Sequence, residues 1–228
     1  AGLPFKALSL LRSIVRSEKP GRIASTAEIV EYAASLGRIG AVEEALVLLR
    51  KLPEKISSQA TLQEGLILFS QWRYRESLAP LRCYIEKCEA GSDSQIVGAT
   101  NLCAALIALG EFSEAKDFLR RYIPMIQQKK YTLMDVVTAT LKAQIHLSEK
   151  SYAEARRCLN EAERKLDDNS SLYHLLICKW RSLVTLFENP GLKELEPLKK
   201  LRAEAGRLKN WETVRDCDFY LGFFGGEK

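Results

Sequence analysis

The residues able to carry chemistry are few, and their spacing does not suit catalysis. The chain of 228 residues has two histidines, His146 and His174, and no Cys-x-x-Cys pair, so we expect no metal site. Glu43 and Glu44 are adjacent, so they point to different faces of a helix and do not form an acid–base pair. The segment 37–40, Gly-Arg-Ile-Gly, follows a predicted helix rather than a strand, so it is not a phosphate loop. With no Gly-x-Ser-x-Gly motif either, we expect no enzyme and no cofactor.

The cysteines favour a reducing compartment. Six of them occur, at 83, 88, 103, 158, 178 and 217, all inside helical patterns. Cys83 and Cys88 are five residues apart, which on a helix places them about 140° apart and leaves them unable to share a metal. Buried, reduced cysteines are therefore expected, and with them a cytoplasmic protein.

Composition predicts a folded chain with a mild positive charge. Hydrophobic residues make up 46% and charged residues 28%, and the net charge is 34 − 29 = +5 with a pI of about 8.8. The basic residues are dispersed and have acids nearby, which is typical of solvated helix faces rather than of a nucleic-acid surface. The longest apolar run, 102–109, is too short to cross a bilayer, so no membrane insertion is expected.

One stretch, residues 102–122, indicates how the chain is organised. It reads as a helix, a turn at Gly110, and a second helix that returns antiparallel, because glycine takes a left-handed C-cap without steric cost. Phe112, Ala115 and Leu119 are spaced three and four apart, so all three face the first helix. A single hairpin cannot bury its apolar face alone, which predicts further copies.

Four copies follow the same pattern. Segments 33–49, 65–81 and 143–159 carry both of its helices, and 2–11 carries only its second helix. The small residues at its centre stand at 7, 45, 77, 115 and 155. This pattern resembles the tetratricopeptide repeat, over roughly residues 1–166. The spacings of 38, 32, 38 and 40 differ from that family's period of about 34, so longer helices are expected, as in the interaction and sensor domains of bacterial regulators.

The resemblance implies an all-α protein, a right-handed αα-superhelix (solenoid) of about five to six antiparallel helix pairs. We expect hairpin repeats over 1–166, a divergent repeat with a capping helix over 167–222, and a tail over 223–228. Breaks are expected at 19–21 and 167–169. The predicted helices are 3–17, 26–36, 41–52, 58–71, 74–89, 93–109, 112–128, 132–148, 152–166, 172–187, 192–208 and 211–221.

The resemblance also implies a binding face, because the first helix of each pair lines the concave side of such a superhelix. Eight residues are predicted there: Arg38, Gln63, Leu66, Asn101, Ala104, Thr140 and Gln144, with Arg181 further on. Asn101 matches the asparagine with which such domains bind a peptide backbone or carboxylate. The charged residues of the family's clamp for acidic tails are missing, since Leu62, Leu66, Val137 and Leu141 stand at those places. Leu62, Val137 and Leu141 either line an apolar groove or pack between repeats.

The leading hypothesis is a non-catalytic module that binds a protein or peptide segment in its groove, as part of a larger bacterial regulatory or assembly protein. The alternative is a ligand- or peptide-sensing solenoid of a transcription or signalling regulator. RNA binding is disfavoured, because Glu31, Gln63, Asn101 and Leu141 form no recurring pattern. A homodimer stays open, because Trp72 replaces the turn glycine and presents an aromatic at a hairpin corner.

Overall fold

The structure, a computed structural model, describes residues 4–16, 23–53, 58–166 and 171–225. Within these ranges every regular element is a helix, which confirms the prediction of an all-α protein. No described helix is both long and apolar enough to cross a membrane. The chain divides into two compact units, 1–110 and 111–228. The sequence had instead suggested a change of character at 166–167. The predicted breaks at 19–21 and 167–169 lie outside the described residues.

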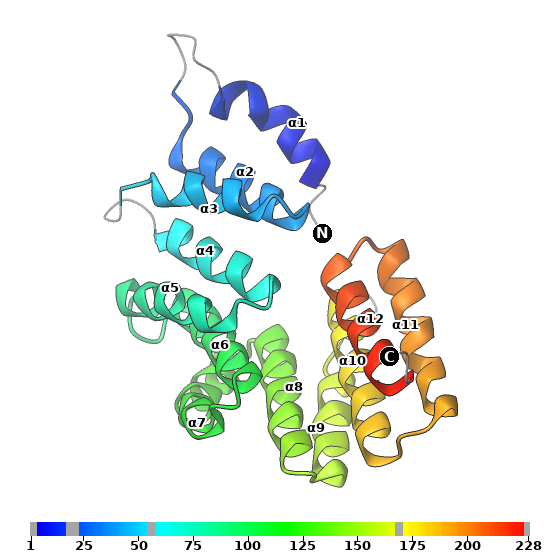
Figure 1. The fold of residues 1–228 in the computed structure, drawn as a ribbon. Coiled ribbons are helices and arrows are strands. Elements are labelled where there is room, and N and C mark those ends of the chain that lie inside the picture. The colour runs from blue at the N-terminus through cyan, green and yellow to red at the C-terminus, as the bar shows by residue number, and fades with distance from the viewer. Residues whose placement is uncertain (1–3, 17–22, 54–57, 167–170, 226–228) are drawn as a thin grey trace. The chain divides into compact units, whose positions relative to one another are not determined.

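The first unit is a succession of helices in which each packs on the next (Figure 1). In addition, α4 contacts both α2 and α6, so that alternate helices also lie side by side. Its core joins Tyr32, Leu46 and Leu68, with Leu8 and Leu11 packed against it. The six helices are α1 (Pro4–Val15), α2 (Thr26–Arg38), α3 (Val42–Arg50), α4 (Ser58–Ser70), α5 (Tyr74–Lys87) and α6 (Asp93–Ala108).

The second unit repeats this scheme of contacts. Neighbouring helices pack together, and α10 also contacts α8 and α12 (Figure 1). One core cluster lies among α8, α9 and α10, and another among α10, α11 and α12. The elements are α7 (Phe112–Gln128), α8 (Thr132–Ser148), α9 (Tyr152–Arg164), α10 (Ser171–Glu188), the 3₁₀ helix η1 (Leu192–Leu195), α11 (Glu196–Arg207) and α12 (Trp211–Gly225).

The predicted helix starts have clear local causes. Ser25 caps α2: its Oγ accepts from the Glu28 N–H at 3.3 Å, while the Glu28 carboxylate accepts from the Ser25 N–H at 2.8 Å. Ser92 caps α6 in the same way through the Gln95 N–H, at 3.1 Å. Each cap provides an acceptor for a backbone N–H that has no partner within the helix.

The hairpin turns share one backbone geometry. Gly40, Trp72, Gly110 and Lys150 all have positive φ, at 90°, 61°, 78° and 58°. At three of these turns the N–H of the following residue donates to the carbonyl five residues earlier: Ala41 to Leu36 at 2.9 Å, Arg73 to Leu68 at 3.0 Å and Ser151 to His146 at 2.8 Å. These are Schellman bonds, which satisfy helix carbonyls that have no partner within the helix. The turn predicted at Gly110 therefore recurs where the sequence pattern places its copies.

The small residues of the pattern lie where helices approach closely. Ala45, Ser77, Ala115 and Ala155 are fully buried, and so are the leucines four positions later, except for slight exposure at Leu49 and Leu119. A Cβ added at Gly65 would lie 2.7 Å from Cγ of Leu81, so α4 and α5 could not pack as they do with a larger residue there. The spacing of small and large residues thus sets the helix contacts.

Two details differ from the predicted elements. The helix expected over 192–208 is divided into η1 and α11, and Pro197 stands in the first turn of α11, where its missing N–H has no consequence. Residues 223–225, predicted as part of a tail, continue α12 instead, because Phe224 packs against the core formed by α10 and α11. Residues 226–228 lie outside the described ranges.

Candidate functional site

In the first unit, the residues predicted to line the concave face lie on α2, α4 and α6. α4 contacts both α2 and α6. Gln63 and Leu66 on α4, and Asn101 and Ala104 on α6, are half-buried, and Arg38 is exposed at the end of α2. Arg38 lies 3.9 Å from the Glu31 carboxylate of its own helix. The structure therefore places two amide and two apolar side chains on the neighbouring helices α4 and α6, and a charged pair on α2.

Asn101 has a defined orientation. Its Nδ2 donates to the Val97 carbonyl, one turn earlier on α6, at 2.8 Å. This bond uses one of the two N–H groups of the carboxamide and fixes the side chain against its helix. The oxygen and the second N–H are the groups with which a carboxamide binds a peptide backbone.

The three predicted residues in the second unit have different surroundings. Thr140 is 1% exposed, and its hydroxyl donates to the Val137 carbonyl at 2.7 Å, so it does not belong to an exposed face. Gln144 is half-buried. Arg181 binds both Glu163 oxygens, at 3.1 and 2.9 Å, and the Asn160 carboxamide oxygen at 3.1 Å. These bonds raise the pKa of Arg181 and lower that of Glu163. Arg181 is thus held within its own unit.

Two of the three leucines at the family's clamp positions are packed. Leu62 and Leu141 are both buried, and Val137 is half-buried. Of the two interpretations that the sequence left open for these residues, burial favours packing between repeats for Leu62 and Leu141. An apolar lining of the face would then depend on the half-buried residues Leu66, Ala104 and Val137.

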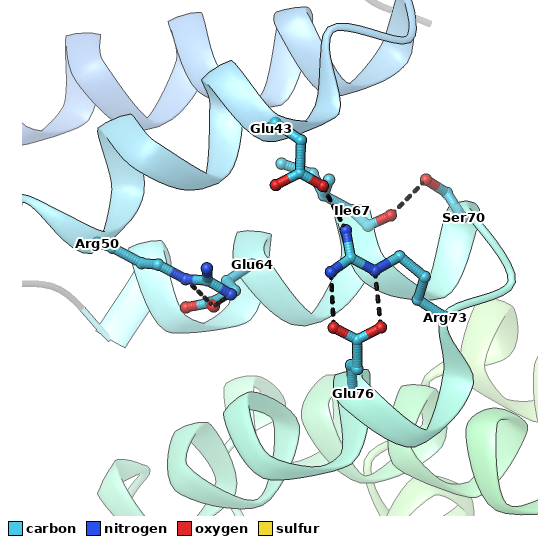
Figure 2. A network of polar contacts seen from close by, with 7 residues as sticks. All are labelled: Glu43, Arg50, Glu64, Ile67, Ser70, Arg73 and Glu76. Atoms are coloured by element: carbon cyan, nitrogen blue, oxygen red, sulfur yellow. Dashed lines mark hydrogen bonds and ion pairs between the residues drawn. The ribbon is translucent and has the colours of Figure 1, made fainter.

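Ion pairs at the hairpin corners were missed by the sequence analysis. Arg73, which precedes α5, bonds to both oxygens of Glu76, at 2.8 and 2.6 Å, and reaches Glu43 on α3 at 2.7 Å (Figure 2). These bonds raise the pKa of Arg73 and lower that of Glu76. A second ion pair joins α3 to α4: Arg50 of α3 binds Glu64 of α4 at 2.8 Å (Figure 2).

The second unit has equivalent corner pairs. Lys116 of α7 binds Glu149, which follows α8, and Arg156 of α9 binds Glu188 at the end of α10. The paired residues are 33 and 32 positions apart, against 30 for Glu43 and Arg73. These ion pairs could have been predicted from the sequence, because residues of opposite charge recur at about the length of one repeat. Each exposed pair is worth about 0–1 kcal/mol, so these pairs fix the register of neighbouring helices more than they stabilise the fold.

A buried ion pair joins α10 to α12. Nζ of Lys179 lies 2.7 Å from Oδ2 of Asp216, and Lys179 is only 8% exposed. Burial alone would lower the pKa of Lys179, but the facing carboxylate outweighs it and raises that pKa. The neighbouring Trp180 ring lies 5.4 Å from Nζ. Both charges are enclosed and paired, so this site reads as structural.

Little in the structure points to catalysis or metal binding. His174 and Cys178 are four residues apart on α10, a spacing that can place two ligands on one face. In the part of the chain that the structure describes, however, no group of three or more His, Cys, Asp or Glu side chains is placed to hold a metal. Burial raises the pKa of Cys103 to about 12 and of Cys217 to about 11, so neither thiol is a ready nucleophile.

Comparison of the chain with protein-family models, with curated proteins and with solved structures gives no match.

Proposed function

We propose that the chain is a tetratricopeptide-like superhelical domain that binds a peptide segment without catalysing a reaction. The recurring hairpin supports this most directly. Four turns have a residue of positive φ at the position the pattern requires, followed in each case by a fully buried small residue. First helices contact one another in each unit, α2 with α4, α4 with α6 and α8 with α10, as in a right-handed superhelix.

The proposed peptide site, the amide face, consists of Gln63, Leu66, Asn101 and Ala104 on α4 and α6. All four are half-buried, so they are accessible yet held in place. Carboxamides donate to and accept from a peptide backbone, and Leu66 and Ala104 offer apolar contact between them. Since none of the four is charged, the segment bound is an apolar one in extended or helical form rather than an acidic tail.

The experiment uses the 228-residue chain as bait and identifies what it retains. Fragments of each retained protein are then measured for direct binding to the wild type and to the Asn101→Ala/Leu66→Glu variant. We expect one apolar fragment to bind, with an affinity about tenfold or more lower for the variant, equal to about 1.4 kcal/mol or more. Val47→Glu, an exposed change on α3, is the control and should keep full affinity.

Binding that is equal for the wild type and the amide-face variant would exclude this face as the site. If no protein fragment binds but a small molecule raises the melting temperature, the chain is a ligand sensor instead.

A further inference from the structure

The surface between α1 and α2 is hollowed. The two helices pack against each other, and the recess between them, the α1–α2 recess, has a volume of about 320 Å³. Ligand pockets range upward from about 300 Å³, so a small organic molecule fits. Six residues line the recess: Leu8, Ser9 and Arg12 of α1, Arg16 directly after α1, and Tyr32 and Leu36 of α2.

One wall of the recess carries hydrogen-bond donors. Ser9, Arg12 and Arg16 are spaced three and four residues apart, and all three are exposed. The Arg16 N–H donates to the Arg12 carbonyl at 3.0 Å, so the helical turn continues through Arg16. Side chains at this spacing lie one above another on a helix. A hydroxyl and two guanidiniums therefore follow one line along the recess.

The floor of the recess, Tyr32 and Leu36, belongs to the core of the first unit. These side chains are 2% and 5% exposed, and Leu8 of the opposite wall packs against the same cluster. Because the core holds the floor in place, its apolar surface is present before any ligand binds. The ring of Tyr32 adds a planar surface, against which a flat organic group packs well.

Arg16 is positioned by two contacts. Its Nη2 pairs with the Glu44 carboxylate of α3, and its guanidinium carbon lies 5.8 Å from the centre of the Tyr32 ring. A guanidinium has five N–H donors, so a contact through Nη2 leaves others for a ligand. Glu44 thus orients Arg16 at the recess and takes up only part of its hydrogen-bonding capacity.

The charge of the recess is positive and suits a phosphate ester. α1 itself holds no acidic residue, and two arginines against the one carboxylate of Glu44 leave a net charge of +1. A phosphate monoester carries about −1.5 to −2 charges at pH 7 and three acceptor oxygens. Two guanidiniums and a hydroxyl can donate to all three, and the planar fork of arginine matches phosphate geometry.

We propose that the α1–α2 recess binds a small phosphate monoester. Its phosphate lies against Ser9, Arg12 and Arg16, and its organic group covers Tyr32 and Leu36. The small volume of the recess favours a compact molecule over a peptide chain. The inference is independent of peptide binding, because the amide face lies on α4 and α6.

Titration of the ¹⁵N-labelled 228-residue chain with phenyl phosphate, followed by NMR, tests the proposal. Inorganic phosphate and phenol are titrated in parallel, because each supplies only one of the two parts of the probe. Arg12→Gln removes a phosphate donor, and Ser9→Trp fills the recess without changing its charge. Lys6→Gln is the matched control, since it removes the same charge from an exposed position of α1 that does not line the recess. Circular dichroism shows whether each variant is folded.

Phenyl phosphate should bind the wild type and Lys6→Gln alike, and more tightly than inorganic phosphate or phenol. Arg12→Gln should weaken it about tenfold or more, because a charge-assisted hydrogen bond is lost. Ser9→Trp should abolish binding. A wild type that does not bind phenyl phosphate overturns the proposal, and so does an equal loss in Lys6→Gln and Arg12→Gln. Equal affinity for phenyl phosphate and inorganic phosphate, or full affinity in Ser9→Trp, overturns it as well.

Discussion

At the scale of single residues, the ion pair with the least exposed side chains in the described part of the chain is Lys179–Asp216, at 10% and 14%. Both side chains belong to helices that are otherwise joined by leucines, Cys217 and Val214. Taking two charges out of water costs several kcal/mol each, and their mutual contact at 2.7 Å, with Arg215 3.6 Å from the Asp216 carboxylate, offsets this. Removing one partner of such a pair lowers the stability of the fold strongly, whereas replacing both partners with apolar residues lowers it much less.

We therefore expect Asp216→Asn alone to lower the free energy of unfolding by about 3–5 kcal/mol, because it leaves the buried Lys179 ammonium without the carboxylate that it contacts. Lys179→Met alone should lower it by less, because Arg215 still lies 3.6 Å from the Asp216 carboxylate. The double variant Lys179→Met/Asp216→Leu should recover most of that loss. Urea denaturation of the four proteins measures both effects. If the double variant loses as much as the two single variants together, the residues do not act as a pair.

The same pair predicts a dependence on pH. The folded state raises the pKa of Lys179 above its unfolded value. Its contribution is therefore complete below the ordinary lysine pKa of about 10.4, and it is lost as the pH rises from there through the folded-state pKa. The stability advantage of the wild type over the Lys179→Met variant should be constant near neutrality and shrink in alkaline buffer.

At the scale of elements, the sequence predicted the helices well because its turns are local. Apolar periodicity and turn residues placed α6, α7 and α8 within a residue of their observed bounds. Trp72 and Lys150 are not residue types that favour a left-handed turn. Their positions in the repeat nevertheless predict one, and both residues have positive φ. The sequence did not predict how deeply each side chain is buried. The repeat register assigns Thr140 to the binding face, but its side chain is buried.

The shared turn geometry makes a prediction for two positions. Lys150 has a φ of 58°, a conformation that costs a residue with a Cβ about 1 kcal/mol or more, so Lys150→Gly should raise the free energy of unfolding by about that amount. Gly40→Ala should lower it by a similar amount, although a Cβ at Gly40 would meet no atom within 4 Å. Thermal denaturation measures both.

Lys129→Gly is the matched control for these turns. Lys129 follows α7 with a φ of −77°, where glycine brings no relief of strain. That variant should be neutral or slightly destabilised. A gain in stability at Lys129 equal to that at Lys150 would show that the effect is not due to the left-handed turn.

At the scale of the whole molecule, the contacts and the repeat pattern divide the chain differently. The pattern pairs residues 93–109 with 112–128, whereas the contacts separate the chain after Gly110. This division could not be read from the sequence, because the hairpin at 102–122 has the clearest motif in the chain. Within α7 to α12, the ion pairs Lys116–Glu149 and Arg156–Glu188 join residues 33 and 32 positions apart, and the core clusters join residues of different helices. Helical periodicity does not reveal such partners.

Two fragments distinguish these divisions. Residues 111–228 contain two complete core clusters, with Leu159 and Ile177 in one and Leu198 and Cys217 in the other. We expect this fragment to fold alone, with the helical signal of six α-helices and a cooperative melt. Adding α6, in a fragment of 93–228, should then change the melting temperature little. If 93–228 folds and 111–228 does not, the hairpin of α6 and α7 is the folding unit, and the repeat pattern is the better guide to the domain boundary.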